Sequence, residues 1–186
     1  MQLTALQRRG QVYGNRSESG FSMIELLVAV LIMGIGVLGV TALQMVSLQN
    51  NRGALQRAEA VQLAYDMMDR VRANPAGTPA GSAYSGLDLA DAPPNAQNCN
   101  TQNCTQAQMV SFDQAIWKCS LGDFHTANIC QTLRTAGVIA DEEDQPGLSE
   151  GDGSITVDAN GVINITVQWV ELASQQIRTI TINSQS

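Results

Sequence analysis

The sequence predicts an α+β protein in which one long N-terminal helix packs on a small antiparallel sheet at the C-terminus. Three observations support this fold class. Residues 26–51 carry no charged side chain and can cross a bilayer as a helix, which takes about 20 apolar residues. Residues 52–73 keep apolar side chains at helical spacing, and segments within residues 155–182 alternate apolar and polar side chains, as strands do.

A short junction precedes the apolar run. It reads GFSMIELLVA from Gly20, and Glu25 lies at the mouth of the uncharged segment. A carboxylate at that position in a membrane helix is costly, so it indicates a functional residue with a positively charged partner. Upstream, Arg8, Arg9 and Arg16 form a basic leader that the positive-inside rule places in the cytoplasm.

This junction resembles the class III signal of type IV prepilins and pseudopilins. The resemblance implies cleavage after Gly20 by a membrane aspartyl peptidase, methylation of the new N-terminus at Phe21, and loss of residues 1–20 as a leader peptide. A Sec signal peptide would instead show a small-x-small cleavage site after the apolar run, where this chain continues as helix. Glu18 departs from the pattern, because leaders of this family are usually neutral or basic near the cut.

Glu25 is predicted to neutralise a buried positive charge. The α-amino group of a mature Phe21 lies one helical turn away, either in the same subunit or in the next one. The resemblance implies that the partner is the N-terminus of a neighbouring subunit and that the ion pair sets the axial register of a fibre. The alternative is that Glu25 only extends to the membrane interface.

The helix is predicted to continue beyond the membrane as an amphipathic segment. Its expected apolar face consists of Val61, Ala64, Tyr65, Met68 and Val71. Pro75 ends the helix, because a proline excludes the helical conformation from the residue before it. We therefore divide the mature chain into an apolar helix half at residues 21–50, an amphipathic half at residues 51–74 and a globular domain at residues 75–186.

Glycines interrupt this helix at Gly34, Gly36 and Gly39 in the apolar half and at Gly53 further on. Each costs the helix up to about 1 kcal/mol relative to alanine. Two explanations stay open: close helix packing in the membrane, and a segment that bends or melts when the subunit enters a fibre. Major pilins usually carry a helix-breaking proline where this chain has Ala42, and its absence favours a minor subunit.

Four cysteines follow a loop-like segment rich in proline and glycine. An even number in an exported domain predicts two disulfides, with three possible connectivities. We favour Cys99 with Cys104 and Cys119 with Cys130, because both pairs close short loops. A zinc site is the alternative, but the paired C-x-x-C spacing that it would need is missing, and redox catalysis is disfavoured for the same reason.

A second helix is predicted after the first cysteine pair. Thr105 and Gln108 have the spacing of a capping box at its start. The residues that then share one helix face are Met109, Phe112, Ile116 and Cys119. A further short helix is expected within residues 124–136, where Gly137 stops it.

The order of Cys99, Cys104, Asp113 and Trp117 resembles the PilV-type minor pilin family, in which the same elements stand between the long helix and the C-terminal sheet. The resemblance implies the type IV pilin fold for the whole mature chain. The second cysteine pair is an addition to the general pattern of that family.

The densest cluster of charged residues is the acidic run at residues 141–144. Some pseudopilins hold calcium in an acidic loop near the C-terminus, but this loop lacks the D-x-D-x-D-G spacing, so a solvated loop is the default expectation. The alternative calcium ligands are Asp141, Glu142, Glu143, Asp144 and Asp152. His125 is the single histidine and has no catalytic partners in sight, so we expect a surface or capping side chain.

The C-terminus is predicted to form an antiparallel meander. Residues 155–158 lead into the hairpin turn Asn160-Gly161. Residues 163–169 alternate apolar and polar side chains, and residues 176–182 supply a third strand. One face of this sheet should pack on the amphipathic half of the helix.

Composition and motifs exclude several functions. The chain has a net charge of −7, which argues against a nucleic-acid binder because such proteins present a basic patch. It shows no phosphate-binding glycine loop, no Ser/His/Asp set and no metal triad, so we expect neither an enzyme nor a bound cofactor.

The resemblance instead implies a minor pilin that primes type IV pilus assembly and lies at or near the pilus tip. Its expected partners are the prepilin peptidase, the inner membrane, other minor pilins, the major pilin and a tip adhesin, with links to adhesion and twitching motility. The domain would be periplasmic before assembly and extracellular afterwards. The alternatives are a minor pseudopilin of a type II secretion system and a single-pass anchored sensor with a periplasmic ligand-binding domain.

Overall fold

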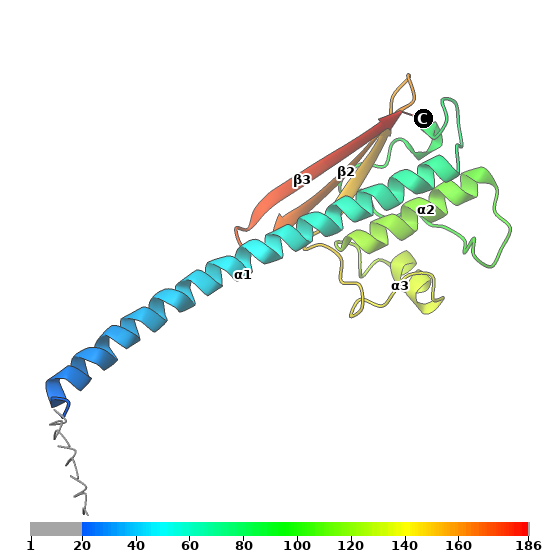
Figure 1. Cartoon of the computed structure of the whole chain (residues 1–186). Coiled ribbons are helices and arrows are strands. Elements are labelled where there is room, and N and C mark those ends of the chain that lie inside the picture. The colour runs from blue at the N-terminus through cyan, green and yellow to red at the C-terminus, as the bar shows by residue number, and fades with distance from the viewer. Residues whose placement is uncertain (1–19, 186) are drawn as a thin grey trace, which may run out of the picture. The chain divides into compact units, whose positions relative to one another are not determined.

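The computed structural model describes residues 20–185, so the predicted basic leader with Glu18 lies outside the described residues. The elements are α1 (Met23–Ala73), the 3-10 helix η1 (Ser82–Tyr84), α2 (Gln106–Leu121), α3 (Asn128–Thr135), β1 (Asp152–Val157), β2 (Val162–Glu171) and β3 (Gln176–Gln185) (Figure 1). The chain divides into two compact units after Met45, and α1 contributes to both. The predicted α+β class is confirmed: a long N-terminal apolar helix and a three-stranded antiparallel sheet.

The first unit contains the N-terminal part of α1. Ser22 caps this helix, because its hydroxyl accepts a hydrogen bond from the amide of Ile24 at 3.4 Å and its carbonyl accepts bonds from the amides of Glu25 and Leu26. All side chains from Gly20 to Met45 are exposed. By length and composition, α1 is able to cross a membrane.

In the second unit, α1 buries one stripe of side chains against the rest of the domain. The buried residues are Ala60, Leu63, Ala64, Met67, Met68 and Val71. The predicted face is confirmed at Ala64, Met68 and Val71. It was wrong at its edge, because Val61 is only half-buried and Tyr65 is 54% exposed. Ala60 and Ala64 lie at the centre of the stripe, since small side chains let other elements approach the helix axis closely.

The sheet has the strand order β1-β2-β3, with both pairs antiparallel. The central strand β2 buries every second side chain, namely Ile163, Ile165, Val167 and Trp169. Ile180 of β3 lies opposite Val167 and packs against the same core. The hairpin at Asn160-Gly161 is confirmed, with Gly161 in the left-handed region at φ 80°.

Strand β1 begins at Asp152, three residues before the predicted start at Ile155. The prediction missed this start because residue 153 is a glycine. Trp117 packs so close to the strand that a Cβ on Gly153 would come within 2.3 Å of its ring. Only glycine allows a strand to run there, and glycine is weak evidence for a strand in sequence.

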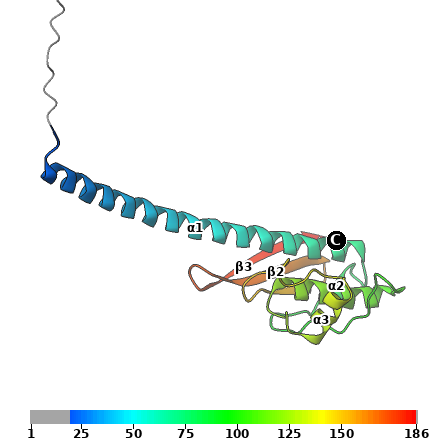
Figure 2. The same ribbon diagram turned by 90° about the horizontal axis from the view of Figure 1, so that it is seen from below.

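Helices α2 and α3 build a second, smaller core. The residues of this core are Phe112, Ala115, Ile116, Cys119, Cys130 and Leu133. The capping box of α2 is confirmed, since Thr105 and Gln108 bond each other's backbone amides. Helix α3 starts at Asn128, later than the expected residue 124. Figure 2 shows the sheet, α2 and α3 on the same side of the domain's part of α1.

Candidate functional site

The processing junction lies at the exposed start of α1. Gly20 and Phe21 precede the helix, and Phe21 is 79% exposed, so the peptide bond between them is accessible. Glu25 occupies the first turn, where the positive end of the helix dipole stabilises a carboxylate. Ser22 and Glu25 also have the spacing of a capping box, a local signal that the sequence analysis did not use.

The apolar side chains of α1 up to Leu48 are not covered by any other part of the described chain. Large apolar residues from Phe21 through Leu48 are all at least half exposed, with Leu27, Leu38 and Leu43 at 70% or above. A contiguous surface of this size marks contact with a membrane or with other proteins. The arrangement therefore fits insertion into a membrane or packing against other proteins.

The structure joins Cys99 to Cys104 and Cys119 to Cys130, with Cα–Cα distances of 5.6 and 5.3 Å. The first bond closes the loop that leads into α2. The second is buried and ties α2 to α3. Since residues 20–185 contain no free cysteine, they offer no thiol for zinc or redox chemistry.

The acidic residues considered for calcium do not form one site. Residues 141–144 lie in an exposed turn. Asp152 belongs to the domain core, where it pairs with Lys118, away from that turn. No group of three or more metal-binding side chains is arranged around a common point in the described chain.

Lys118 is completely buried, a feature that the sequence analysis missed. Its Nζ donates to Asp152 Oδ1 at 2.5 Å and to the carbonyl of Asp88 at 2.9 Å, and lies 5.2 Å from the centre of the Phe124 ring. The other oxygen of Asp152 accepts from the backbone amide of Ala90. A buried ion pair of this kind is tolerated because further hydrogen bonds satisfy both partners.

His125 is half-buried and bridges two segments. Its Nε2 lies 2.7 Å from the carbonyl oxygen of Pro146, and its Nδ1 contacts the guanidinium of Arg134 on α3. The ring therefore acts as a structural link between α3 and the loop before β1, and no nucleophile is among its contacts.

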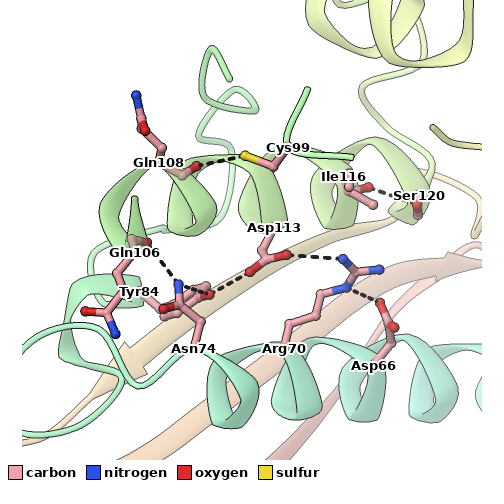
Figure 3. A network of polar contacts seen from close by, with 10 residues as sticks. All are labelled: Asp66, Arg70, Asn74, Tyr84, Cys99, Gln106, Gln108, Asp113, Ile116 and Ser120. Atoms are coloured by element: carbon pink, nitrogen blue, oxygen red, sulfur yellow. Dashed lines mark hydrogen bonds and ion pairs between the residues drawn. The ribbon is translucent and has the colours of Figure 1, made fainter. Parts of the chain in front are cut away.

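A polar network fastens α2 and η1 to α1 (Figure 3). Arg70 of α1 donates to Asp66 at 2.9 Å and to Asp113 of α2 at 3.2 Å. The second oxygen of Asp113 accepts from the Tyr84 hydroxyl at 2.6 Å, and Asn74 donates to that hydroxyl at 3.0 Å. Asp113 is thus the centre of the attachment between helix and domain.

One turn further along α2, Trp117 makes a second attachment. Its ring is completely buried in the main core, and its Nε1 donates to the carbonyl of Leu63 on α1 at 2.9 Å. Asp113 and Trp117 are the residues on which the sequence resemblance depended. The structure shows that both point from α2 to α1.

Replacing Tyr84 with phenylalanine should reduce the amount by which the free energy of unfolding falls at alkaline pH. Burial raises the pKa of Tyr84, and its hydrogen bond to Asp113 raises it further. The folded state therefore holds this proton more tightly than the unfolded state, and the associated stability is present below about pH 10 and is lost as the pH rises above it. We expect the wild type to lose more free energy of unfolding than Tyr84→Phe between pH 9 and 11, as measured by urea titration; equal losses would contradict this assignment.

Comparison with known proteins agrees with this geometry. Residues 15–41 match the family model described as the prokaryotic N-terminal methylation motif. Residues 42–115 match the model described as type IV pilin Tt1218. No curated protein matches the chain, and no solved structure does.

The two matched segments adjoin, and the fold that contains them is the type IV pilin fold. The chain is therefore similar to type IV pilins over residues 42–115 and to proteins with an N-terminal methylation motif over residues 15–41. Such a motif implies processing by a prepilin peptidase and assembly with other pilins.

Proposed function

We propose that this chain is a minor pilin, similar to the PilV type, which helps to prime type IV pilus assembly and is incorporated at or near the pilus tip. The observation that carries the proposal is the Gly20-Phe21 junction, followed by Glu25 in the first turn of a helix whose apolar side chains are exposed. The absence of a proline before Pro75 supports a minor subunit over the bulk fibre subunit.

The proposed sequence of events starts in the inner membrane, with the domain in the periplasm. Cleavage after Gly20 creates an ammonium group at Phe21, and methylation keeps its positive charge. Glu25 neutralises that charge, in its own subunit or in a neighbour, because an unpaired charge in an apolar surrounding is very costly. The apolar helix then exchanges lipid contacts for contacts with other pilin helices, and Asp113 and Trp117 carry the domain along with it.

Two other functions are consistent with some of these features. A minor pseudopilin of a type II secretion system shares every feature of the N-terminus. A single-pass anchored sensor shares the helix but predicts an uncut leader. The cysteine-containing domain favours the pilus, where it would supply contacts to other minor pilins, the major pilin or a tip adhesin.

The first test is mass spectrometry of the N-terminus from membranes of cells with and without the prepilin peptidase. We expect N-methylated Phe21 in the first strain and an uncut leader in the second. Replacing Gly20 with valine should also leave the leader uncut, because the bulkier side chain obstructs the cut. A leader that persists in cells with active peptidase would contradict the pilin function and leave the anchored sensor.

The same strains separate pilus from secretion. Deleting the gene for this chain should strongly reduce the number of surface pili, while the protein itself should be recovered only in small amounts from sheared pili. Normal piliation together with a defect in protein secretion would support the pseudopilin instead.

A further inference from the structure

The hairpin between β2 and β3 exposes two large apolar side chains. Leu172 is 54% exposed and Ile177 is 65% exposed, whereas the inward-facing apolar side chains of β2 are buried. Leu172 lies in the turn that joins the strands, and Ile177 is the second residue of β3, opposite Val170 in the ladder. Exposed apolar groups gathered at the tip of a hairpin indicate a contact surface.

This hairpin lies against the first turns of the domain's part of α1. A groove there is lined by Gln49, Gly53 and Arg57 of α1 and by Ser174 and Arg178 of the hairpin. The carboxylate of Glu171 lies over Gly53, since a Cβ there would come within 2.9 Å of Glu171 Oε1. In Figure 1 the turn joining β2 and β3 is the end of the sheet nearest to these turns of α1.

Chain length puts this part of α1 at the membrane surface. A hydrocarbon core of about 30 Å that begins at Leu26 ends near Met45, at a rise of about 1.5 Å per residue. Gln49 and Gly53 then lie about 6 and 12 Å beyond the core, at the level of the head groups and just outside them. The hairpin therefore packs on residues of α1 that follow the end of the membrane segment by only one to two helical turns of chain, within reach of an interface that binds amphipathic surfaces.

The charge near the hairpin fits an anionic surface. Arg57 and Arg178 line the groove with Glu171, and Arg52 precedes Gly53 in α1, although the whole chain has a net charge of −7. Arg178 bonds Glu171 at 2.8 Å, which lowers the pKa of that carboxyl together with the bond from Ser174. Neither Arg52 nor Arg57 forms an ion pair within residues 20–185. Guanidinium groups bind phosphate oxygens well, because their donors match the geometry of the anion.

We propose that the β2–β3 hairpin and the adjoining arginines form a lipid-docking surface. Leu172 and Ile177 enter the head-group layer of the periplasmic leaflet, while Arg52 and Arg57 bind the phosphates of anionic lipids. The inference rests on the proposed function, since it requires α1 to be anchored in the membrane. This contact holds the domain in one orientation on the bilayer before assembly and is given up when the subunit enters a fibre.

The test uses the full chain in vesicles of brominated phosphatidylglycerol, which quenches tryptophan fluorescence on contact. Leu172→Trp places a reporter in the hairpin, and Ala159→Trp places one in the exposed turn between β1 and β2, at the opposite end of the sheet. Trp117 and Trp169 are buried and give both variants the same background. We expect at least twofold more quenching of the added fluorescence for Leu172→Trp than for Ala159→Trp.

Flotation of the vesicles separates the possible failures. If the protein floats with the vesicles and the two reporters are quenched equally, the docking surface is wrong and the membrane anchor stands. If the protein does not float, both the anchor and the inference fail. A Leu172→Trp emission that shifts to the blue with protein concentration, without quenching, would show that the hairpin binds a second protein copy and would overturn the lipid assignment.

A second arm tests the arginines. Exchanging brominated phosphatidylglycerol for brominated phosphatidylcholine should lower the quenching of Leu172→Trp at least twofold. Adding Arg52→Gln and Arg57→Gln should lower it to a similar extent in phosphatidylglycerol. Quenching that stays the same in both lipids and in the arginine variant would overturn the phosphate contact.

Discussion

Replacing Asp152 with alanine is expected to lower the free energy of unfolding by about 3–5 kcal/mol, the usual cost of removing one member of a buried ion pair. Lys118 has no exposed surface and keeps only the carbonyl of Asp88 as an acceptor once the carboxylate is gone. The backbone amide of Ala90 loses its acceptor as well. The measurement is urea unfolding in detergent micelles, followed by the fluorescence of the two buried tryptophans.

The matched control is the double variant Lys118→Met with Asp152→Leu. It removes both charges and keeps apolar volume, so it should be less destabilised than Asp152→Ala alone. A double variant that loses the sum of both single effects would show that the two residues act independently. A loss below about 1 kcal/mol for Asp152→Ala would mean that water reaches the ammonium group.

Replacing Asp113 with alanine should lower the free energy of unfolding by about 2–4 kcal/mol. The change deprives the Tyr84 hydroxyl of its acceptor and Arg70 of its less exposed partner. The expected decrease in the free energy of unfolding is smaller than for Asp152→Ala. The Arg70 side chain is 30% exposed, so water can replace part of the lost interaction with Asp113. The same urea titration measures it.

Asp66 provides the control for this prediction, because it pairs with the same guanidinium but its side chain is 49% exposed. Asp66→Ala should cost less than about 1 kcal/mol. Equal effects of the two substitutions would contradict the assignment of Asp113 as the centre of the attachment. In cells, Asp113→Ala should lower the amount of intact protein, since loss of stability exposes a chain to proteolysis.

Local signals in the sequence were sufficient for much of the fold. The uncharged run after Glu25, the capping box at Thr105 and the turn at Asn160-Gly161 each depend on residues within a few positions of one another. The processing junction is of the same kind, because a peptidase recognises a short segment in the leader and the start of the helix. The alternation along β2 likewise predicted which side chains are buried.

The errors and omissions concern contacts between distant segments. Spacing along α1 allowed several neighbouring stripes, and only the sheet and α2 select the one that leaves Tyr65 exposed. Asp152 stood in an acidic segment of the sequence, but its partner Lys118 lies on another element. The sequence likewise could not show that the Glu171 side chain lies over Gly53, because the two residues are on different elements.

The sequence by itself determined the membrane-length helix, the capped second helix and the C-terminal meander, because short-range periodicity and backbone preferences specify them. Only the tertiary structure decided how the domain is fastened to its helix, through Asp113, Trp117 and the buried Lys118–Asp152 pair, and where the β2–β3 hairpin lies. These features depend on long-range burial, which desolvates charges and forces each one to find a partner on another element.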